Sequence, residues 1–570
     1  MRGFRPALLV SLTVCLLSTG CASVPGGRLS PSDQSEGSSG TRGPARITIA
    51  TFRELSFIPY SAIPGSYELR NAVNPGLAVL DDRGTLRPVL AEAVPSLENG
   101  FWKLFPDGRM ETTWMIRPGA LWHDGVALNA DDLLFTLAVG RDRATGAFGQ
   151  PAYGSIEGVA APDAQTILLT WREPYIDADQ MFTMWLGWPL PKHVLEGPYL
   201  NDPASLIQSP FWTQDYVGSG PYQVREYVPG LRIGLEAFDK FLLGRPKIEA
   251  IDVVYTPDPS TVLADILAGT VDLTVGLGLP VDSVAEMRER WREGKFSLEF
   301  ADTRWFTLHP QFIDPAPAVV GDLRFRRALL YAIDRQEMAD SLQAGLGPVA
   351  QTFMAPDQPD YAGIEARVMK YEFDPRKAIQ MIEALGYARG TDGLMHETSG
   401  KTLEVEIAGS SDAVTKTMLS VADYWQRVGV ASTTFITPPQ RATDWEYRAT
   451  FSSFSLFTGT HDLPALPALL STQARTAENH YEIGGLPNWS RYRSAELDDL
   501  VNRFFRTIPK GDRIDLLTRI NQHIFENLTT MGLYYFPTPY AVANRVANVP
   551  TGRASRASMT WNVHLWDVRG

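Results

Sequence analysis

The sequence has 570 residues, with 65 Asp and Glu against 52 Lys and Arg, which gives a formal net charge of −13 at neutral pH. This acidic balance argues against nucleic acid or an anionic membrane surface as the partner of the protein. The length predicts two or three domains, whose hydrophobic cores are large enough to be stable without disulfides.

Residues 1–20 are predicted to be a cleavable export signal. Arg2 and Arg5 precede an uncharged, mostly apolar run from Ala7 to Ser18. As a helix this run rises only about 18 Å, which is too short to cross a bilayer. Cys21 follows directly after a glycine, and this arrangement resembles the bacterial lipoprotein signal, in which the cysteine is acylated and becomes the mature N-terminus. The alternative is an ordinary secretory signal that leaves a free thiol.

Cleavage of this signal also accounts for the cysteine content. Cys15 lies inside the signal and Cys21 at the new N-terminus, so the mature chain would have one cysteine and no internal disulfide. Residues 21–44 are rich in Gly, Ser and Pro and contain almost no apolar residue. They are therefore predicted to be a flexible tether.

The body of the chain alternates between strand and helix patterns. Ile47 and Ile49 alternate with polar neighbours, which predicts a strand, and the run from Leu403 to Ile407 repeats this pattern. A helix is predicted to begin after the N-cap Asp374 and to end at Gly386. Together the two kinds of pattern predict an α/β chain of several domains.

Two more helices are indicated by apolar residues at helical spacing. One covers residues 413–428, with Trp425 on its buried face. The other contains the apolar stripe from Phe325 to Ile333, beside which lie three arginines, Arg324, Arg326 and Arg327. These arginines are interpreted as a solvated, salt-bridged face, and an anion site is the alternative.

Several short motifs follow one another along the body in a characteristic order. The strongest block consists of Pro106-Asp107-Gly108, Trp114 to Gly119, Trp122-His123-Asp124-Gly125 and Ala130-Asp131-Asp132. The other blocks are Val79 to Ala93, Val217-Gly218-Ser219-Gly220-Pro221-Tyr222, Leu267 to Leu273 and Leu323 to Arg335. This ordered set resembles the family of extracellular solute-binding proteins that includes the oligopeptide-, dipeptide- and nickel-binding members, and it covers nearly all of residues 46–545.

The resemblance implies a two-lobed α/β fold like that of the periplasmic binding proteins (type II, peptide-binding cluster). In such proteins crossing strands join the lobes, the ligand is enclosed between them, and an extra domain is inserted near the N-terminus. Mapped onto this chain, the first lobe takes residues 45–80, 205–300 and 531–570. The inserted domain takes residues 81–204 and the second lobe residues 301–530.

No catalytic or metal-binding constellation accompanies these motifs. His123 and Asp124 supply too few ligands for a metal; a structural turn is expected instead, with Asp124 bonding its own backbone and Gly125 at positive φ. The loop Gly218-Ser219-Gly220 lacks the spacing of a nucleophile turn and is predicted to be a structural crossover. The eight histidines are scattered and no phosphate-binding loop is present. We therefore expect no enzyme activity, no cofactor and no metal site.

The best candidate for ligand contact is the segment 451–464. Its residues alternate as a strand up to Phe457 and then open into a loop that contains Thr460, His461 and Asp462. In peptide-binding relatives the matching loop has an aromatic residue and an acid that holds the ammonium group of the peptide. Direct alignment puts Phe457 at the aromatic position and Thr460 at the acidic one, which leaves Asp462 as the candidate acid. The alternative is that Asp462 caps the turn that follows.

Two further pairs of residues are candidates for the wall of the ligand cleft. Trp305 and His309 follow a predicted crossing strand, and Asn488 and Trp489 precede a segment that weakly resembles the family pattern. Tryptophan suits a ligand cavity because it combines apolar area with a hydrogen-bonding tip. Ordinary packing between the lobes is the alternative for each of them.

The resemblance, together with the predicted export signal, implies the substrate-binding component of an ABC importer. It would be an extracytoplasmic monomer, anchored to the cell membrane through Cys21, that captures a small ligand, above all an oligopeptide, and delivers it to the permease subunits. One alternative is a ligand-sensing or surface lipoprotein of the same fold without a transport role. Another is a binder of a metal chelate, a sugar or an opine, because the fold does not determine the ligand.

Overall fold

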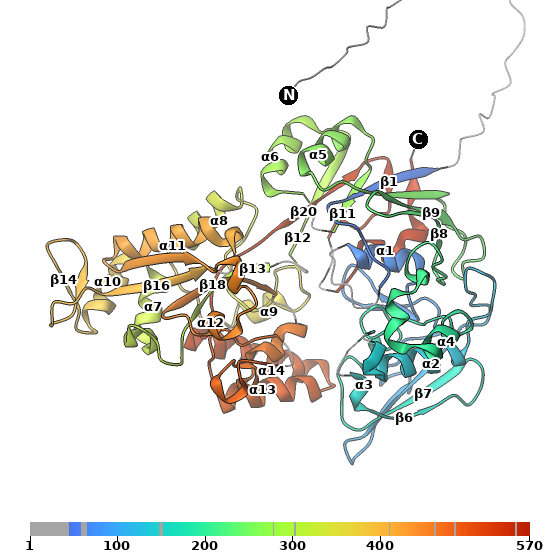
Figure 1. The fold of residues 1–570 in the computed structure, drawn as a ribbon, viewed down its shortest axis with the longest axis horizontal. Coiled ribbons are helices and arrows are strands. Elements are labelled where there is room, and N and C mark those ends of the chain that lie inside the picture. Colours follow the sequence, from blue (N-terminus) through green and yellow to red (C-terminus); the bar gives the residue numbers. More distant parts are fainter. Residues whose placement is uncertain are drawn as a thin grey trace, which may run out of the picture. The chain divides into compact units, whose positions relative to one another are not determined.

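The computed structural model describes residues 45–569 except 59–64, 146, 149–151, 277–278, 301–303, 410, 461–462, 484–485, 553 and 555. The predicted export signal, Cys21 and the tether therefore lie outside the described residues. Strands and helices alternate along the body, as expected for an α/β chain (Figure 1).

The largest sheet has seven strands, which lie in the order β12 (Gly294–Glu299), β20 (Thr538–Ala543), β11 (Leu273–Val275), β1 (Arg46–Thr51), β10 (Ala250–Tyr255), β9 (Arg232–Ala237) and β8 (Tyr222–Val228). β1 pairs in parallel with both β10 and β11. Ile47 and Ile49 of β1 are buried, so the strand predicted from their alternation is confirmed.

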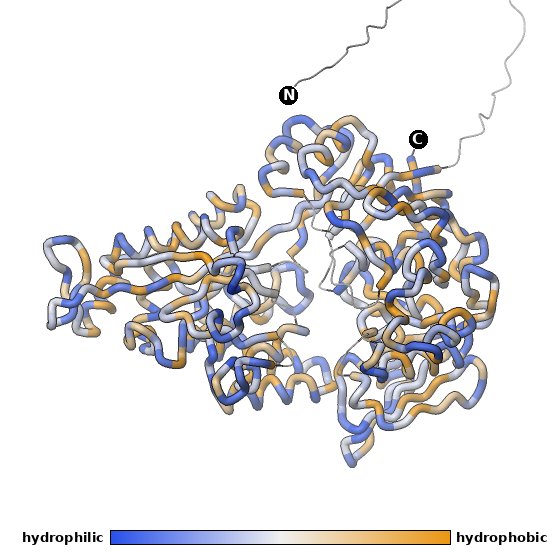
Figure 2. Tube along the Cα trace, viewed as in Figure 1, coloured by the Kyte–Doolittle hydropathy of each residue, from blue (hydrophilic) through white to orange (hydrophobic). Residues whose placement is uncertain are grey.

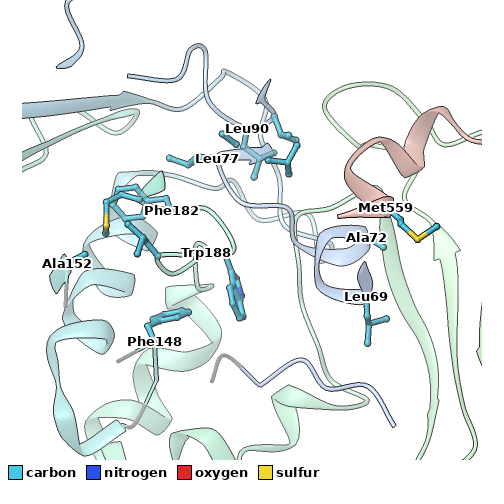
Figure 3. Close-up of a cluster of buried hydrophobic side chains, with 14 of the residues drawn as sticks. Leu69, Ala72, Leu77, Leu90, Phe148, Ala152, Phe182, Trp188 and Met559 are labelled. Atoms are coloured by element: carbon cyan, nitrogen blue, oxygen red, sulfur yellow. The ribbon is translucent and has the colours of Figure 1, made fainter. Parts of the chain in front are cut away.

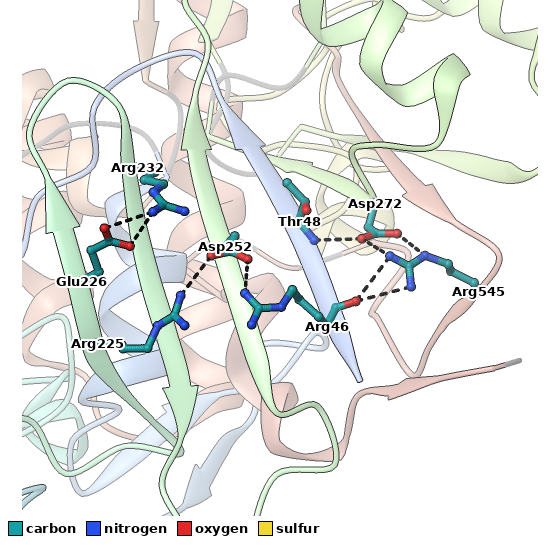
Figure 4. Close-up of polar contacts among 8 residues, drawn as sticks. All are labelled: Arg46, Thr48, Arg225, Glu226, Arg232, Asp252, Asp272 and Arg545. Carbon is teal, nitrogen blue, oxygen red and sulfur yellow. Dashed lines mark hydrogen bonds and ion pairs between the residues drawn. The ribbon is translucent and has the colours of Figure 1, made fainter. Parts of the chain in front are cut away.

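A buried carboxylate joins three parts of this sheet that are far apart in the sequence. Asp272 lies just before β11, and Arg545 lies shortly after β20. The Asp272 carboxylate accepts hydrogen bonds from Arg545 Nε (2.5 Å) and Nη2 (2.6 Å) (Figure 4). It also accepts a hydrogen bond from the backbone N–H of Thr48 in β1 (2.8 Å). The bidentate ion pair with Arg545 and the hydrogen bond from Thr48 together hold β1 close to the end of β20.

The second sheet has five strands in the order β17 (Ala431–Ile436), β16 (Glu404–Gly409), β18 (Phe454–Thr460), β13 (Arg304–Pro310) and β19 (Met531–Tyr535). The chain passes between the two large sheets from β12 to β13 and again from β19 to β20. The strand predicted at residues 403–407 is confirmed as β16. β19, which begins at the predicted lobe boundary at residue 531, pairs with β13 in this second sheet.

A third sheet lies within residues 81–204 and has the order β4 (Trp102–Leu104), β5 (Met110–Met115), β7 (Thr166–Trp171) and β6 (Ile156–Ala160). Three two-stranded pairs complete the strands of the described chain: β2 (Ala78–Leu80) with β3 (Leu86–Pro88), β14 (Ala388–Arg389) with β15 (Met395–His396), and β21 (Val546–Ala547) with β22 (Asp567–Val568).

The helices of the described chain are mostly short. They are α1 (Ser66–Val73), α2 (Ala130–Arg141), α3 (Ala152–Ser155), α4 (Lys192–Asn201), α5 (Pro259–Ala268), α6 (Val281–Arg290), α7 (Leu323–Tyr331), α8 (Arg335–Leu342), α9 (Tyr361–Glu365), α10 (Pro375–Glu383), α11 (Thr415–Arg427), α12 (Trp445–Ala449), α13 (Ala495–Arg506) and α14 (Lys510–Asn527). The predicted N-cap of α10 is confirmed, because the Asp374 side chain accepts a hydrogen bond from Lys377 N (2.9 Å).

One interpretation of the helix α7 is wrong. Arg324 is exposed and pairs with Asp322, as a solvated face requires. Arg326, in contrast, is only 4% exposed and donates hydrogen bonds to the carbonyl oxygens of Val320 (2.9 Å) and Asn527 (3.0 Å). This guanidinium therefore fastens α7 to the end of α14 and is not part of a solvated face.

The strongest sequence block is organised around a buried acid. Asp132, 3% exposed, accepts hydrogen bonds from Trp122 Nε1 (3.2 Å), from the backbone N–H of Asn129 (3.0 Å) and from that of Lys192 (2.9 Å). Together with the Asn129 side chain it forms the capping box of α2. One carboxylate thus joins a turn, the start of α2 and the start of α4.

The predicted turn and the predicted crossover loop are in direct contact. His123 Nδ1 accepts a hydrogen bond from Gly218 N (3.2 Å), and Nε2 donates one to Gly220 O (3.1 Å). Burial lowers the pKa of His123 to about 4, so the ring is neutral at neutral pH. A Cβ at Gly218 would lie 2.0 Å from Val73 O, which explains the glycine. Both structural roles are confirmed, since Asp124 accepts from Val126 N and Gly125 has a φ of 88°.

The hydrophobic core is continuous over much of the described body. A cluster shown in Figure 3 includes Leu69 and Ala72 of α1 and Met559 near the C-terminus, together with Phe182 and Trp188 from the third-sheet region. Hydrophobic and hydrophilic segments alternate along the whole described trace in Figure 2, as expected when each element buries one face. The core thus holds the first and last parts of the body against the third-sheet region.

Candidate functional site

A cavity of about 130 Å³ lies where β13 and β18 meet the loop around Asn488; we call it the apolar cavity. A dry cavity of about 150 Å³ can hold a benzene molecule, so there is room for one aromatic or branched apolar group. None of the described residues that line it carries a permanent charge. They are Trp305, His309, Phe353, Phe457, Gly459, Ala465, Ala468, Leu469, Leu486, Pro487, Asn488, Trp489, Ser490, Tyr492, Leu497, Thr529 and Thr530.

The structure brings together most of the residues predicted to contact the ligand. The apolar cavity is lined by Trp305, His309, Phe457, Asn488 and Trp489. Thr460 is the last residue of β18, and its side chain lies outside the description. His461 and Asp462 lie outside the described residues, so the candidate acid stays a prediction.

The pairing of two strands explains why residues distant in sequence meet. β13 and β18 are antiparallel, with Trp305 opposite Gly459 and Thr307 opposite Phe457. Side chains alternate between the faces of a strand, so Trp305 and His309 point to the same side of β13. Gly459 has no side chain and therefore leaves the space beside Trp305 open.

Aromatic rings form the walls of the apolar cavity. Trp305 is 2% exposed and lies edge-to-face against Phe353, with ring centroids 5.5 Å apart. On another side Trp489 contacts Phe457 with a centroid distance of 5.2 Å, and the guanidinium of Arg448 lies 4.7 Å from the Trp489 ring centre. Such walls offer polarisable apolar area to a ligand.

His309 is held in its neutral form. The Ser490 hydroxyl donates its proton to Thr529 O, so it accepts from His309 Nδ1, 3.3 Å away. Nε2 then accepts from the Thr307 hydroxyl (3.0 Å). Burial lowers the pKa of His309 to about 4. At neutral pH the apolar cavity therefore presents an uncharged imidazole.

Replacing His309 with glutamine should make the protein less sensitive to acid. The folded-state pKa of about 4 lies below the ordinary 6.5, so the unfolded chain binds the proton more readily. The free energy of unfolding of the wild type therefore falls as the pH drops from 6.5 toward 4, and His309 accounts for about 2 kcal/mol of this loss. Urea unfolding at about pH 7 and about pH 4.5 measures the difference.

His396 provides a control of opposite sign. Its pKa is raised by the hydrogen bond to Asp392, so its stabilising contribution is present at low pH and is lost as the pH rises. His396→Gln should therefore steepen the loss in acid. Parallel pH profiles for the wild type and His309→Gln would contradict a buried, neutral His309.

Asn488 has a positioning role in addition to lining the cavity. Its side-chain N–H groups donate to Tyr492 O (2.8 Å) and Leu470 O (3.3 Å). The residue is 8% exposed. These bonds hold the loop that carries Trp489, so the shape of the apolar cavity depends on Asn488.

A second, larger cavity of about 520 Å³ is strongly polar; we call it the charged cavity. One set of its walls comes from the residues around β2 and β3, from residues 176–180 and from Ala554 and Arg556. The other set comes from residues 354–360, from Leu463 and Pro464, and from α13 and α14. Phe353 and Met354 are neighbours that line the apolar and the charged cavity respectively, so the two sites lie close together.

Ion pairs neutralise part of the charge in the larger cavity. Asp177 pairs with Arg556 (3.1 Å) and also accepts a hydrogen bond from Gln180 Nε2 (2.9 Å). Lys510 pairs with Asp360 (3.6 Å). Asp179 has no ion-pair partner within 4.0 Å in the described part of the chain.

Of the residues that line the charged cavity, only Leu463 and Pro464 lie in the contact segment predicted from the sequence, and sequence reasoning missed all of the charged ones. Its charged residues come from segments that show no motif, such as Asp179 in the short helix η2 (Ala178–Gln180) and Arg513 in α14. In the apolar cavity it missed Phe353 and Leu469, which have the composition of ordinary core residues. The segment after Asn488 was the one available signal, and it contributes Ser490 and Tyr492.

No group of three or more His, Cys, Asp or Glu side chains in the described chain is arranged to hold a metal ion. No helix of the described chain has the length and apolar character needed to span a bilayer.

The chain is similar to known proteins in sequence and in fold. The family described as bacterial extracellular solute-binding proteins, family 5 (middle) matches residues 86–476. Over 332 residues the chain is 26% identical to a Brucella ovis protein named as a candidate ABC transporter peptide-binding protein. Over 349 residues it is 24% identical to the oligopeptide-binding protein AppA of Bacillus subtilis.

These matches cover 58% and 60% of this chain, and they span 58% and 59% of the length of the two relatives. The solved structure of Bacillus subtilis AppA in complex with a nonapeptide superposes with a TM-score of 0.66 at 20% identity. That superposition covers 92% of this chain and 100% of the AppA chain. It establishes a shared fold over nearly the whole body.

Proposed function

The chain belongs to the bacterial extracellular solute-binding proteins of family 5, and we propose on this basis that it captures a small ligand and delivers it to an ABC importer. The observation that carries the proposal is the charged cavity, because its walls come from two separate parts of the body. A cavity of this kind can enclose a ligand and release it chemically unchanged when the two parts move apart.

We assign these two parts to lobes. The first lobe consists of residues 45–80, 205–300 and 538–570, the inserted domain of residues 81–204, and the second lobe of residues 301–535. The change from the division expected from the sequence follows from β19, which pairs in the second sheet. The two passages between the sheets then serve as the crossing strands around which the lobes hinge.

We further propose that the ligand is an oligopeptide. The apolar cavity accommodates one apolar side chain, and the charged cavity beside it suits polar and charged groups. The relatives named for peptide or oligopeptide binding support this ligand class. Of the residues predicted from the sequence, we assign Trp305, Phe457 and Trp489 to ligand contact, and His309 and Asn488 to shaping the apolar cavity.

The anchor and the partners belong to the same proposal. Acylation of Cys21 would hold the mature protein at the membrane, because each buried CH₂ contributes about 0.8 kcal/mol and several acyl chains act together. The tether at residues 21–44 would let the body reach the permease. The protein would act as a monomer that binds and does not modify its ligand.

Native mass spectrometry of the full-length protein, purified from bacterial membranes, tests these points in one experiment. We expect a bound species with the mass of a peptide, and a chain that starts at an acylated Cys21. Incubation of that peptide with the protein should leave its mass unchanged. A cleaved peptide would contradict a binding role, and a bound sugar or metal chelate would contradict the peptide assignment alone.

A further inference from the structure

The charged cavity has an incomplete charge balance. Its lining contains the carboxylates Asp177, Asp179 and Asp360 and the cations Arg83, Lys510, Arg513 and Arg556. Asp177 is paired with Arg556, and Asp360 is paired with Lys510. Asp179 on one wall, and Arg83 and Arg513 on others, have no ion-pair partner within 4.0 Å among the described residues.

The location of Asp179 makes an unpaired charge costly. The side chain is partly buried, and desolvation followed by the nearby charge of Asp177 raises the pKa of Asp179 to about 7. Arg513 and Arg556 oppose this shift only in part. A carboxylate that faces a roomy cavity and has no cation within ion-pair distance is stabilised when a ligand supplies one.

We propose that Asp179 binds a protonated amine of the ligand and that Arg513 binds an anionic group of the same ligand. This inference rests on the proposed function and narrows its ligand class to zwitterions. A purely cationic ligand would be repelled by Arg83 and Arg513, and a purely anionic one would be repelled by Asp179. A molecule that carries both charges satisfies both walls, since the two residues come from η2 and α14.

The two walls also connect recognition to closure. Asp179 belongs to the inserted domain, and Arg513 to the second lobe as assigned above. A zwitterion that bridges them interacts with both only when the lobes are closed, so its binding energy favours the closed form. A neutral sugar gains nothing from this pair of charges.

Isothermal titration calorimetry with the full-length protein at about pH 8 tests the inference. The probes are the tetrapeptide Ala-Phe-Ala-Ala, its N-acetylated form and its C-terminally amidated form. For the wild type we expect the N-acetylated and the amidated peptides to bind about tenfold or more weakly than the free peptide. N-acetyl-Ala-Lys-Ala-Ala distinguishes an N-terminal amine from a lysine side chain as the source of the cation.

The variants separate the two charges. Asp179→Asn should lower the affinity for the free peptide by about tenfold or more and leave the affinity for the N-acetylated peptide unchanged. Arg513→Gln should weaken binding of the free peptide by about tenfold or more and leave binding of the amidated peptide unchanged. Asp423→Asn removes the same charge from the exposed face of α11, a helix that does not line the cavity among the described residues. It should leave all affinities unchanged.

Stability of the ligand-free protein is an independent readout. Because the pKa of Asp179 is raised, its stabilising contribution is present at low pH and lost as the pH rises through about 7. Asp177, Arg513 and Arg556 face this carboxyl, and Arg83, Lys510 and Asp360 complete the charged lining. Asp179→Asn avoids the loss, so it should raise the Tm at about pH 8 by about 2 °C and leave it unchanged near about pH 4.

The outcomes are distinguishable. If the wild type binds the free peptide and Asp179→Asn binds it equally well, the inference is wrong and the proposed function stands. If no peptide binds the wild type, both the peptide assignment and this inference are contradicted. A Tm of Asp179→Asn that is lower than that of the wild type at about pH 8 would also overturn the inference, because the carboxylate would then be compensated by the protein itself.

Discussion

Trp425→Ala should lower the free energy of unfolding by about 3–5 kcal/mol, the largest loss of stability that we expect from a single substitution. Trp425 is fully buried in the core of the second sheet, 5.0 Å from Phe454 between ring centroids. Its Nε1 donates a hydrogen bond to Leu329 O (3.0 Å), so alanine leaves both a cavity and an unpaired carbonyl. Urea unfolding followed by far-UV circular dichroism measures the loss.

The same helix provides the matched control. Leu419 of α11 is 53% exposed, so Leu419→Ala should change the free energy of unfolding by less than about 0.5 kcal/mol. Equal effects of the two substitutions would mean that α11 does not pack through the face that carries Trp425. The comparison removes helix propensity as an explanation, because both variants introduce alanine.

Gly459→Leu should abolish binding of an apolar group in the apolar cavity while the fold is retained. A Cβ at Gly459 would lie 3.3 Å from the Phe457 ring and 3.8 Å from Trp305 Nε1, so a leucine side chain enters the cavity. Burying one apolar side chain contributes about 1.5–3 kcal/mol. The variant should therefore lose a factor of about 10 to 150 in affinity for Ala-Phe-Ala-Ala.

Calorimetry with a second peptide isolates this effect. Tetra-alanine places no large side chain in the apolar cavity, so its affinity should differ little between the wild type and Gly459→Leu. Gly459→Ala should give an intermediate loss for the phenylalanine peptide. Gly511→Ala is a neutral control, since a Cβ there meets no atom within 4 Å. Retained phenylalanine preference in a stably folded Gly459→Leu would contradict the assignment of the apolar cavity to a ligand side chain.

Local signals in the sequence were sufficient for many elements of the fold. The N-cap Asp374 predicted the start of α10, and the alternation of Ile47 and Ile49 predicted β1. These features depend on neighbours a few residues away, so they are visible in a single sequence. The crossover loop at Gly218 was likewise recognised from its motif, although its contact with His123 was not.

Burial was harder to predict where it depends on a distant element. Arg326 lies between two other arginines, as is typical of a solvated helix face. In the structure, however, the end of α14 covers it and supplies Asn527 O as an acceptor. The pairing of β19 in the second sheet was not predicted, for a related reason. Strand pattern indicates a strand but not the sheet in which it pairs.

The sequence by itself determined the family, the α/β class and three aromatic residues of the apolar cavity (Trp305, Phe457 and Trp489), because each depends on short motifs or on residue type. The tertiary structure alone decided which walls face each other: it joins β13 to β18 across about 150 residues, and it sets Asp179 apart from the paired Asp177. Charge balance in a cavity is a property of several distant segments at once. It therefore has no counterpart in any local pattern of the chain.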